Sequence, residues 1–290
     1  MRSTVDLGGQ VAIVTGAGKG IGRACALHLA RCGARVLINN RSHPGEALGQ
    51  GSAERVAAQI EAEGGQALAD VADLAVPGAS SRLVERALQA WGRVDMVHAN
   101  AAIGQQRSFE KSDLADLRAV VEVGFGSTLE LFHAVWPVMR RQGGGRLLAT
   151  TSSAGRFGGV GLSAYAASKG AVEALVRSLA LEGARHGIRC NALSPYAESQ
   201  MTREHLPPSW AARLEPEALG PVVAWLLSPG CTLNGEVVVS GGGRHARAWP
   251  VETASVAAER PEQAWNTLLS MPGQRQPDSM RAFQAFMGEG

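Results

Sequence analysis

"QVAIVTGAGKGIG", residues 10–22, decides the fold of this 290-residue chain. Its first half is a run of apolar β-formers, and its second half is a glycine-rich turn that leads into a segment with helical periodicity. Further runs that are apolar at nearly every position, the pattern of strands buried on both faces, are "RVLIN", "VDMVH", "GRLLAT", "IRCNAL" and "GEVVVS". Each of these but the last precedes a candidate helix. The alternation predicts an α/β fold with a doubly wound parallel sheet of about seven strands.

The regular pattern stops near residue 243. After "SGGGRHARAW" the chain is interrupted by Pro250, Pro261, Pro272 and Pro277, which leave room for two short helices, at 261–271 and 279–287. We therefore expect one domain over residues 1–243 and a C-terminal extension over residues 244–290, an arm or lid and not an independent domain.

Composition excludes several classes of protein. A net charge of +2, with the basic residues scattered, gives no reason to expect nucleic acid as a partner. No apolar run has the length of a membrane span, and the N-terminus lacks the apolar core of a signal peptide. The histidines and cysteines lack metal-ligand spacing, so no metal is predicted. The four cysteines show no paired spacing, so we expect a protein of the reducing cytoplasm.

The glycine-rich turn is a candidate dinucleotide site. Gly16, Gly20 and Gly22 stand between a buried strand and a helix, where glycine lets backbone N–H groups approach a pyrophosphate at the helix N-terminus. Glycine-rich turns also join strands to helices for structural reasons alone. The flanking strand and helix favour the dinucleotide interpretation.

The end of the second strand bears on the choice of cofactor. NAD-preferring enzymes present a carboxylate there, whereas an arginine favours the 2′-phosphate of NADP. This chain has Asn40 and Arg41, with Lys19 as a second cation in the glycine loop. A guanidinium can pair with a phosphate and stack on adenine. We predict a preference for NADP(H), with NAD(H) possible if Arg41 is only a solvated loop charge.

A candidate catalytic group lies in "SAYAASKGA". Tyr165 and Lys169 are four residues apart and so share one face of a helix. A phenol must move a proton near neutral pH, well below its ordinary pKa of about 10, and a nearby ammonium favours its ionised form. Ser152 lies thirteen residues upstream, at a strand end, where it can orient the reacting oxygen. Ser153 is the neighbouring candidate.

These motifs resemble the short-chain dehydrogenase/reductase family of the classical type. The resemblance rests on the Gly-x-x-x-Gly-x-Gly spacing, on "HANAAIG", on the serine and YxxxK arrangement, and on "LSPYAESQMT". It implies a Rossmann-like fold, catalysis by Ser152, Tyr165 and Lys169, and the interconversion of a secondary alcohol and a ketone with NAD(P)(H). The cofactor-binding positions that it implies are Gly16, Lys19, Gly20, Ile21, Gly22, Asn40, Arg41, Asp73, Leu74, Asn100, Ala101, Tyr165, Lys169, Pro195, Glu198 and Thr202.

The chain departs from the family pattern at two positions near the proposed site. Gly124 stands where the family has an asparagine that holds a water in its proton relay, and Tyr196 replaces a glycine after the sixth strand. The adenine-contacting aspartate is expected at Asp73, at the end of the third strand, although Asp70 is close enough in sequence to be the alternative.

One branch of the family is more similar than the others, the (3R)-hydroxyacyl-CoA dehydrogenase unit of peroxisomal multifunctional enzyme type 2 and its bacterial relatives. The long loop that ends in "GQGS", the motif "PYAESQMT" and the patch "RHARAW" carry this resemblance. It implies a β-hydroxyacyl or other β-keto thioester substrate. That branch usually has an aspartate where this chain has Asn40 and a small residue where it has Lys19, which is consistent with NAD use there, whereas the cofactor residues of this chain favour reduction with NADPH. The alternatives are an NAD-dependent (3R)-hydroxyacyl-CoA or steroid dehydrogenase, and an NADP-binding sensor with impaired catalysis. The family also implies a homodimer or homotetramer, paired through the helices at 128–139 and 165–182.

Overall fold

The structure is a computed structural model of the whole chain. It describes residues 5–43, 45–47, 49–104, 106–198, 213–258 and 260–287. The chain divides into two compact units, Met1–Arg247 and Ala248–Gly290, each of which is considered by itself.

The first unit is built on a sheet in the strand order β3-β2-β1-β4-β5-β6-β7-β8. The pairs from β3 through β7 are parallel, which confirms the predicted α/β class. The sheet has eight strands where about seven were predicted, and they are β1 (Val11–Thr15), β2 (Arg35–Asn39), β3 (Gln66–Asp70), β4 (Met96–Ala99), β5 (Gly145–Thr150), β6 (Ile188–Pro195), β7 (Val237–Gly241) and β8 (Arg244–Ala248).

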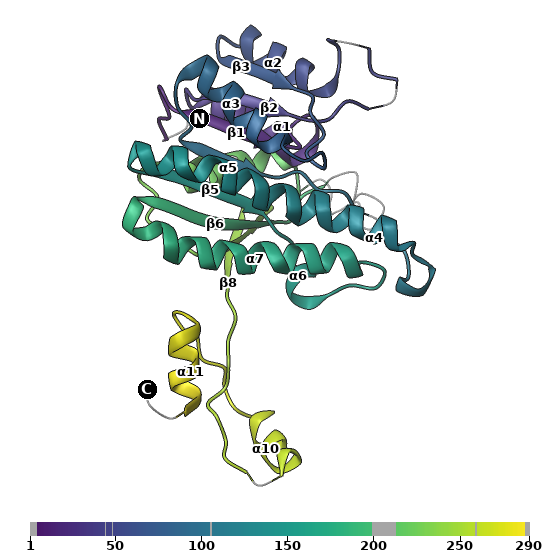
Figure 1. Cartoon of the computed structure of the whole chain (residues 1–290), viewed down its shortest axis with the longest axis vertical. Helices are drawn as coiled ribbons and strands as arrows, with labels where there is room; N and C mark the ends of the chain where they lie inside the picture. Colours follow the sequence, from purple (N-terminus) through teal and green to yellow (C-terminus); the bar gives the residue numbers. More distant parts are fainter. Residues whose placement is uncertain are drawn as a thin grey trace. The chain divides into compact units, whose positions relative to one another are not determined.

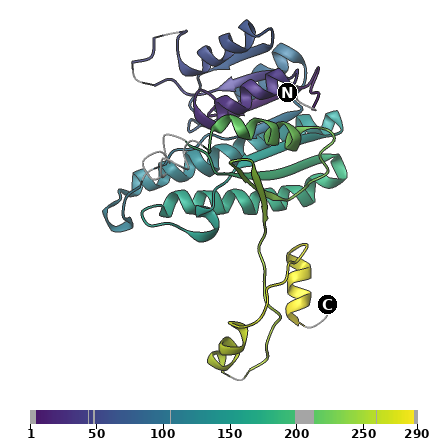
Figure 2. The ribbon, with the colours of Figure 1, turned by 180° about the vertical axis from the view of Figure 1, so that it is seen from behind.

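Helices cover both faces of this sheet (Figures 1 and 2). The helices α5 and α7 lie across one face, while α1 and α9 pack against each other on the opposite face. The bounds of the helices are α1 (Gly20–Arg31), α2 (Ser52–Ala62), α3 (Ala79–Trp91), α4 (Leu114–Val121), α5 (Ser127–Gln142), α6 (Ala154–Phe157), α7 (Ser163–Gly183) and α9 (Gly220–Leu227).

The central strands are buried on both sides, as their sequences predict. Every residue of β1 is buried, and so are the last four residues of β2. Such strands belong to a parallel sheet sandwiched between two helical layers. Because β1 pairs with both β2 and β4, the chain changes direction across the sheet between β1 and β4. In folds of this kind ligands bind at the carboxyl ends of the strands beside that point.

The second unit contains α10 (Pro261–Leu268) and α11 (Ser279–Met287). A two-residue antiparallel bridge joins Glu252 to Gln274 within it. Helix α11 has the bounds that the sequence predicts, and α10 ends three residues before the predicted 271. Among the helices that the structure describes, none has both the length and the apolar composition that crossing a bilayer requires.

Candidate active site

The glycine loop joins β1 to α1 at the carboxyl edge of the sheet. Gly16 has a φ of +61°, and a Cβ on it would lie 2.9 Å from the Cα of Ala101 at the end of β4. Gly20 has a φ of +50°, and a Cβ there would meet open space. The loop therefore rests directly on the neighbouring strand end and leaves room above the start of α1.

This loop fits a dinucleotide cofactor. The N-cap residue Lys19 makes no side-chain cap hydrogen bond, and no acidic residue stands in the first turn of α1. The helix N-terminus thus keeps its partial positive charge, which suits a pyrophosphate. Gly22, in the first turn, is buried, and the side chain of Ile21 packs partly against the core.

A chain of hydrogen bonds connects the loop to β4 and β5. The Asn100 Nδ2 donates to the carbonyl oxygens of Thr15 at 3.2 Å and Gly16 at 3.3 Å. The Thr150 hydroxyl donates to Asn100 Oδ1 at 3.1 Å, and His98 Nε2 lies 3.0 Å from that hydroxyl. The backbone N–H groups of Asn100 and Ala101 both donate to Thr15 Oγ1. This arrangement fixes Asn100 as a structural support of the loop.

His98 is neutral in this chain. Burial, with a smaller contribution from the charge of Lys169, lowers its pKa to about 3. Because the Thr150 hydroxyl proton is used on Asn100, the His98 Nε2 carries the proton and donates it. Its Nδ1 is buried and has no partner among the described residues.

The predicted adenosine end lies at the ends of β2 and β3. Asn40 Nδ2 donates to Ser52 Oγ at 2.7 Å. The long loop after β2 therefore brings the start of α2 back against the Asn40 side chain. Arg41 forms an ion pair with Asp73, with 3.9 Å between Nη1 and Oδ2, and both side chains are about half exposed. Of the predicted residues at this end, Arg41 and Asp73 are thus brought together.

The position of the third strand corrects one expectation. Asp73 and Leu74 were expected at its end, but β3 ends at Asp70 and both lie in the turn beyond. The Asp70 carboxylate is used inside the fold, by Arg86 at 2.9 Å and by the backbone N–H of Ala72. Leu74 is buried. Of the two aspartates, only Asp73 has its carboxylate beside Arg41.

Ser152 and Tyr165 meet beyond the end of β5. Tyr165 lies in the first turn of α7, and a hydrogen bond joins its phenol to Ser152. Burial raises the pKa of Tyr165, and the hydrogen bond with Ser152 lowers it by less. Ser152 Oγ also accepts the backbone N–H of Ala154 at 3.2 Å, which orients its hydroxyl. The phenol is therefore protonated at neutral pH in the protein alone.

Lys169 lies one turn further along α7 and is 1% exposed. Its Nζ donates to the carbonyl oxygen of Thr150 at 2.8 Å and lies 5.7 Å from the centroid of the Tyr165 ring. Burial lowers the pKa of this ammonium to about 8. Ser152, Tyr165 and Lys169 thus form one group at the carboxyl edge of the sheet, with the ammonium still largely charged at neutral pH.

Gly124 lies in a π-helical turn, Glu122–Gly126, that continues α4 into α5. A Cβ on Gly124 would lie 2.7 Å from Ser168 Oγ, next to Lys169 on α7. The backbone of this turn therefore lies so close to α7 that an asparagine at position 124 would force Ser168 to move. The absence of a side chain at Gly124 is built into the packing of these two helices.

The segment after β6 is described only in part. Pro195 is the last residue of β6, and the backbone N–H of Glu198 donates to the carbonyl oxygen of Leu214 at 2.6 Å. Tyr196 is 49% exposed. The predicted contact of Thr202 lies outside the described residues.

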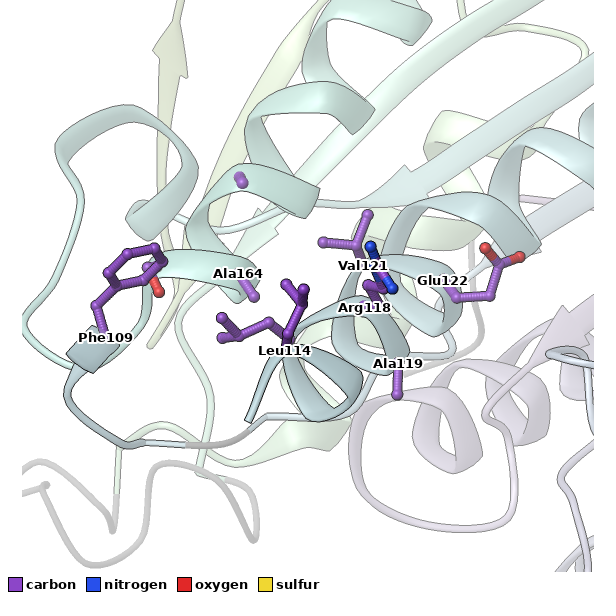
Figure 3. Close-up of a pocket in the computed structure, with 10 residues that line it drawn as sticks. Phe109, Leu114, Arg118, Ala119, Val121, Glu122 and Ala164 are labelled. Carbon is purple, nitrogen blue, oxygen red and sulfur yellow. The ribbon is translucent and has the colours of Figure 1, made fainter. Parts of the chain in front are cut away.

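A groove of about 660 Å³ lies between α4 and the start of α7, and it is largely apolar. Figure 3 shows Leu114 and Val121 of α4 facing Ala164 on the first turn of α7. At 100° per residue, Ala164 lies about 100° around α7 from Tyr165. The groove therefore opens beside the group of Ser152, Tyr165 and Lys169 and on another face of the helix.

Two charged residues beside this group, Arg156 and Glu173, were not predicted from the sequence. They form an ion pair whose side chains are 14% and 7% exposed. Each lies four residues after a predicted catalytic residue, Ser152 and Lys169 respectively. That helical spacing was visible in the sequence, but their pairing across two helices was not.

Comparisons with known proteins show the family of this chain. The family model "short chain dehydrogenase" matches residues 10–208. A short-chain type dehydrogenase/reductase of Mycobacterium tuberculosis is 38% identical over 82% of this chain and 84% of its own length. Peroxisomal multifunctional enzyme type 2 of Mus musculus is 37% identical over 84% of this chain but only 33% of its own length.

Among solved structures, one from Beutenbergia cavernae is described as an NAD(P) dependent gluconate 5-dehydrogenase with bound NADP at low occupancy. It is 34% identical, with a TM-score of 0.73, and the match covers 82% of this chain and 97% of that chain. The resemblance expected from the motifs is confirmed at the level of sequence and of fold. The chain belongs to the short chain dehydrogenase family and is an oxidoreductase of that family.

Proposed function

We propose that this protein interconverts a secondary alcohol and a ketone, with Ser152, Tyr165 and Lys169 as its catalytic residues. The observation that carries the proposal is the hydrogen bond between Tyr165 and Ser152, one helical turn from the buried ammonium of Lys169. These three groups lie at the carboxyl edge of a parallel sheet, beside a loop that fits a dinucleotide.

When bound, a nicotinamide cofactor supplies the hydride in reduction and accepts it in oxidation. In reduction, Tyr165 donates its phenolic proton to the carbonyl oxygen as the carbon receives the hydride, so that an alcohol forms. Its raised pKa keeps that proton in place at neutral pH. Ser152 donates a hydrogen bond to the same oxygen and orients it.

Lys169 acts on the phenol in this scheme. Its ammonium, held by the carbonyl oxygen of Thr150, stabilises the phenolate that remains after proton transfer. In the protein alone, burial is the largest influence on Tyr165 and raises its pKa, and the hydrogen bond with Ser152 lowers it by less. The oxidised nicotinamide would add a second positive charge.

We propose NADP(H) as the preferred cofactor. Asn40 removes the carboxylate that would repel a 2′-phosphate, and Arg41 and Lys19 supply positive charge at the same end. Both of these cations are solvent-exposed. The ion pair of Arg41 with Asp73 is long, at 3.9 Å between half-exposed side chains, so a phosphate can compete for the guanidinium.

For the substrate we propose a β-keto compound of the acyl thioester type. Sequence similarity to peroxisomal multifunctional enzyme type 2 supports this class, although the chain spans only a third of the length of the mouse enzyme. NADPH consumption against β-keto esters, β-keto thioesters and cyclic ketones tests both proposals. Turnover of the β-keto compounds with NADPH over NADH is expected. Silence across the whole panel despite tight NADPH binding would instead indicate a cofactor-binding sensor.

We also propose a homo-oligomer in the cytoplasm, paired through α5 and α7. Leu129 and Leu181 on these helices are 42% and 60% exposed, and the apolar groove of Figure 3 lies beside α7. All four cysteines are buried thiols, which suits a reducing compartment. Light scattering should give a multiple of the 30.3 kDa chain mass; a monomer at micromolar concentration would contradict the pairing.

A further inference from the structure

The ion pair between Arg156 and Glu173 lies directly behind the predicted catalytic group. Arg156 belongs to the short helix α6, four residues after Ser152, and Glu173 lies one turn after Lys169 on α7. Nη1 of Arg156 pairs with Oε1 of Glu173, and both side chains are largely buried. Because both side chains are largely buried, water can hardly replace either partner of the ion pair.

The same pair is tied to two strands. Thr151 Oγ1, at the end of β5, lies 2.9 Å from Glu173 Oε1 and 3.0 Å from the carbonyl oxygen of Lys169. Nη2 of Arg156 donates to Ser194 Oγ in β6 at 2.9 Å. One buried network thus joins the segment that carries Ser152, the helix that carries Lys169, and the strand that ends at the predicted nicotinamide loop.

The backbones of α6 and α7 touch at this point. A Cβ on Gly155 would lie 2.7 Å from the backbone nitrogen of Gly170 and 3.0 Å from the Cβ of Lys169. No side chain separates the turn after Ser152 from the backbone at Lys169. Arg156 directly follows Gly155, so its ion pair with Glu173 lies next to this backbone contact.

A buried ion pair is a poor device for stability, because desolvation consumes most of the energy that the pair gains. Here it joins the segments that carry three reacting groups. We propose that Arg156 and Glu173 are positioning residues, which fix Ser152 against Tyr165 and Lys169. The kinetic test of this inference rests on the proposed function, whereas the second test needs only the titration of the Tyr165 phenol.

The kinetic test compares Arg156→Gln with a matched control, Arg146→Gln. Arg146 is a half-buried arginine, and its guanidinium donates to the carbonyl oxygens of Ser228 and Pro229 in the loop after α9, beyond the amino ends of the strands. We expect Arg156→Gln to lower kcat roughly 100-fold, the scale of a small misplacement of reacting groups, with the Kd for NADPH unchanged within twofold. Arg146→Gln should leave kcat unchanged at a similar loss of Tm. Equal kinetic losses in the two variants would overturn the proposal.

If Arg156→Gln does not fold, Arg156→Lys carries the same test. An ammonium keeps the charge opposite Glu173 but lacks the fork that holds Glu173 and Ser194 together. We expect a loss of kcat of about tenfold, smaller than for the glutamine variant. Full wild-type kcat in Arg156→Lys, with full Tm, would show that the fork is not needed and would contradict the positioning role.

The second test needs no substrate, because the chain has only two tyrosines. In a Tyr196→Phe background, ultraviolet absorbance of the phenolate reports the titration of Tyr165 alone. Lys169 on α7 holds its Nζ 5.7 Å from the centroid of the Tyr165 ring, and Glu173, which pairs with Arg156, lies one turn further along the same helix. Since the hydrogen bond with Ser152 lowers the pKa of Tyr165, loosening Ser152 should raise it.

The double variant Arg156→Gln/Glu173→Gln separates position from charge, since it removes the pair without leaving an unpaired carboxylate. We expect the pKa of Tyr165 to rise in the single and in the double variant. A wild-type pKa in the double variant would overturn the positioning role. If wild-type protein turned over no substrate at all, the proposed function would fail, and this titration would still decide the role of the pair.

Discussion

Helices α1 and α7 both start at the carboxyl edge of the sheet, yet they bury different kinds of side chain. The buried residues of α1 are small or apolar: Gly22, Ala24, Cys25, Ala26, Leu27 and Leu29. Helix α7 buries Ser168, Lys169 and Glu173 beside its apolar residues. At α1 the backbone N–H groups can do the binding, so the side chains are free to form the core. In the proposed function the side chains of α7 do the chemistry, so charges must enter the core at a cost in stability.

Among the changes on α7, Tyr165→Phe is expected to cause the largest loss of activity. It removes the proton donor and keeps the ring, so turnover should fall by roughly 1000-fold or more while NADPH binding stays within a few-fold of wild type. Steady-state rates and fluorescence titration of NADPH measure the two quantities. Residual turnover above a tenth of wild type would remove Tyr165 from its proposed role.

Leu29→Ala is the matching change on α1. Leu29 is fully buried in the cluster beneath β1 and β2, so the truncation should lower the free energy of unfolding by about 2–5 kcal/mol. At a temperature where the variant remains folded, kcat and KM should match wild type. Urea unfolding and rates at 15 °C check this. A loss of kcat without loss of stability would contradict the division of labour between the helices.

Asn40→Asp is expected to have the smallest effect. The new carboxylate would repel a 2′-phosphate and accept hydrogen bonds from ribose hydroxyls, so the ratio of kcat/KM for NADPH to that for NADH should fall roughly tenfold. Arg31→Gln, at the far end of α1, is a control with an exposed ion pair of its own. If wild type already prefers NADH, the proposed cofactor is wrong, whatever the variant does.

The sequence predicts what depends on short-range pattern. The apolar strands, the glycine loop and the YxxxK spacing are local, and the strands and helices are found close to where they were expected. The end of β3 was placed three residues too late because the apolar pattern does not show that Asp70 is held by Arg86 and closes the strand. β8 was not expected, because "RHARA" lacks the apolar run from which the buried strands were predicted. Its residues are mostly exposed, as those of an edge strand are.

The network of Arg156 and Glu173 could not be predicted for a different reason. The partners are seventeen residues apart on two helices, and their meeting depends on the glycine contact between α6 and α7. The packing of Gly124 against Ser168 is of the same kind. Such contacts follow from the way the helices pack, which no periodicity along one segment shows.

Lys169→Met tests the comparison of the two helices most directly, because it is read as activity and as stability. The pKa of Lys169 is lowered from 10.5 to about 8 by burial. The charged form is therefore disfavoured in the folded protein, and this cost is present in full below pH 8 and disappears as the pH rises to 10.5. Across that pH window, the free energy of unfolding of wild type should rise by up to roughly 3 kcal/mol relative to that of the methionine variant.

The measurement is urea unfolding of wild type and Lys169→Met at pH 7 and at pH 10, together with kcat at pH 7. We expect a variant that has lost about 100-fold in kcat and is at least as stable as wild type at pH 7, with the difference in free energy of unfolding shifting in favour of wild type at pH 10. A variant that unfolds more easily than wild type at pH 7, as Leu29→Ala should, or that keeps wild-type kcat, would contradict it.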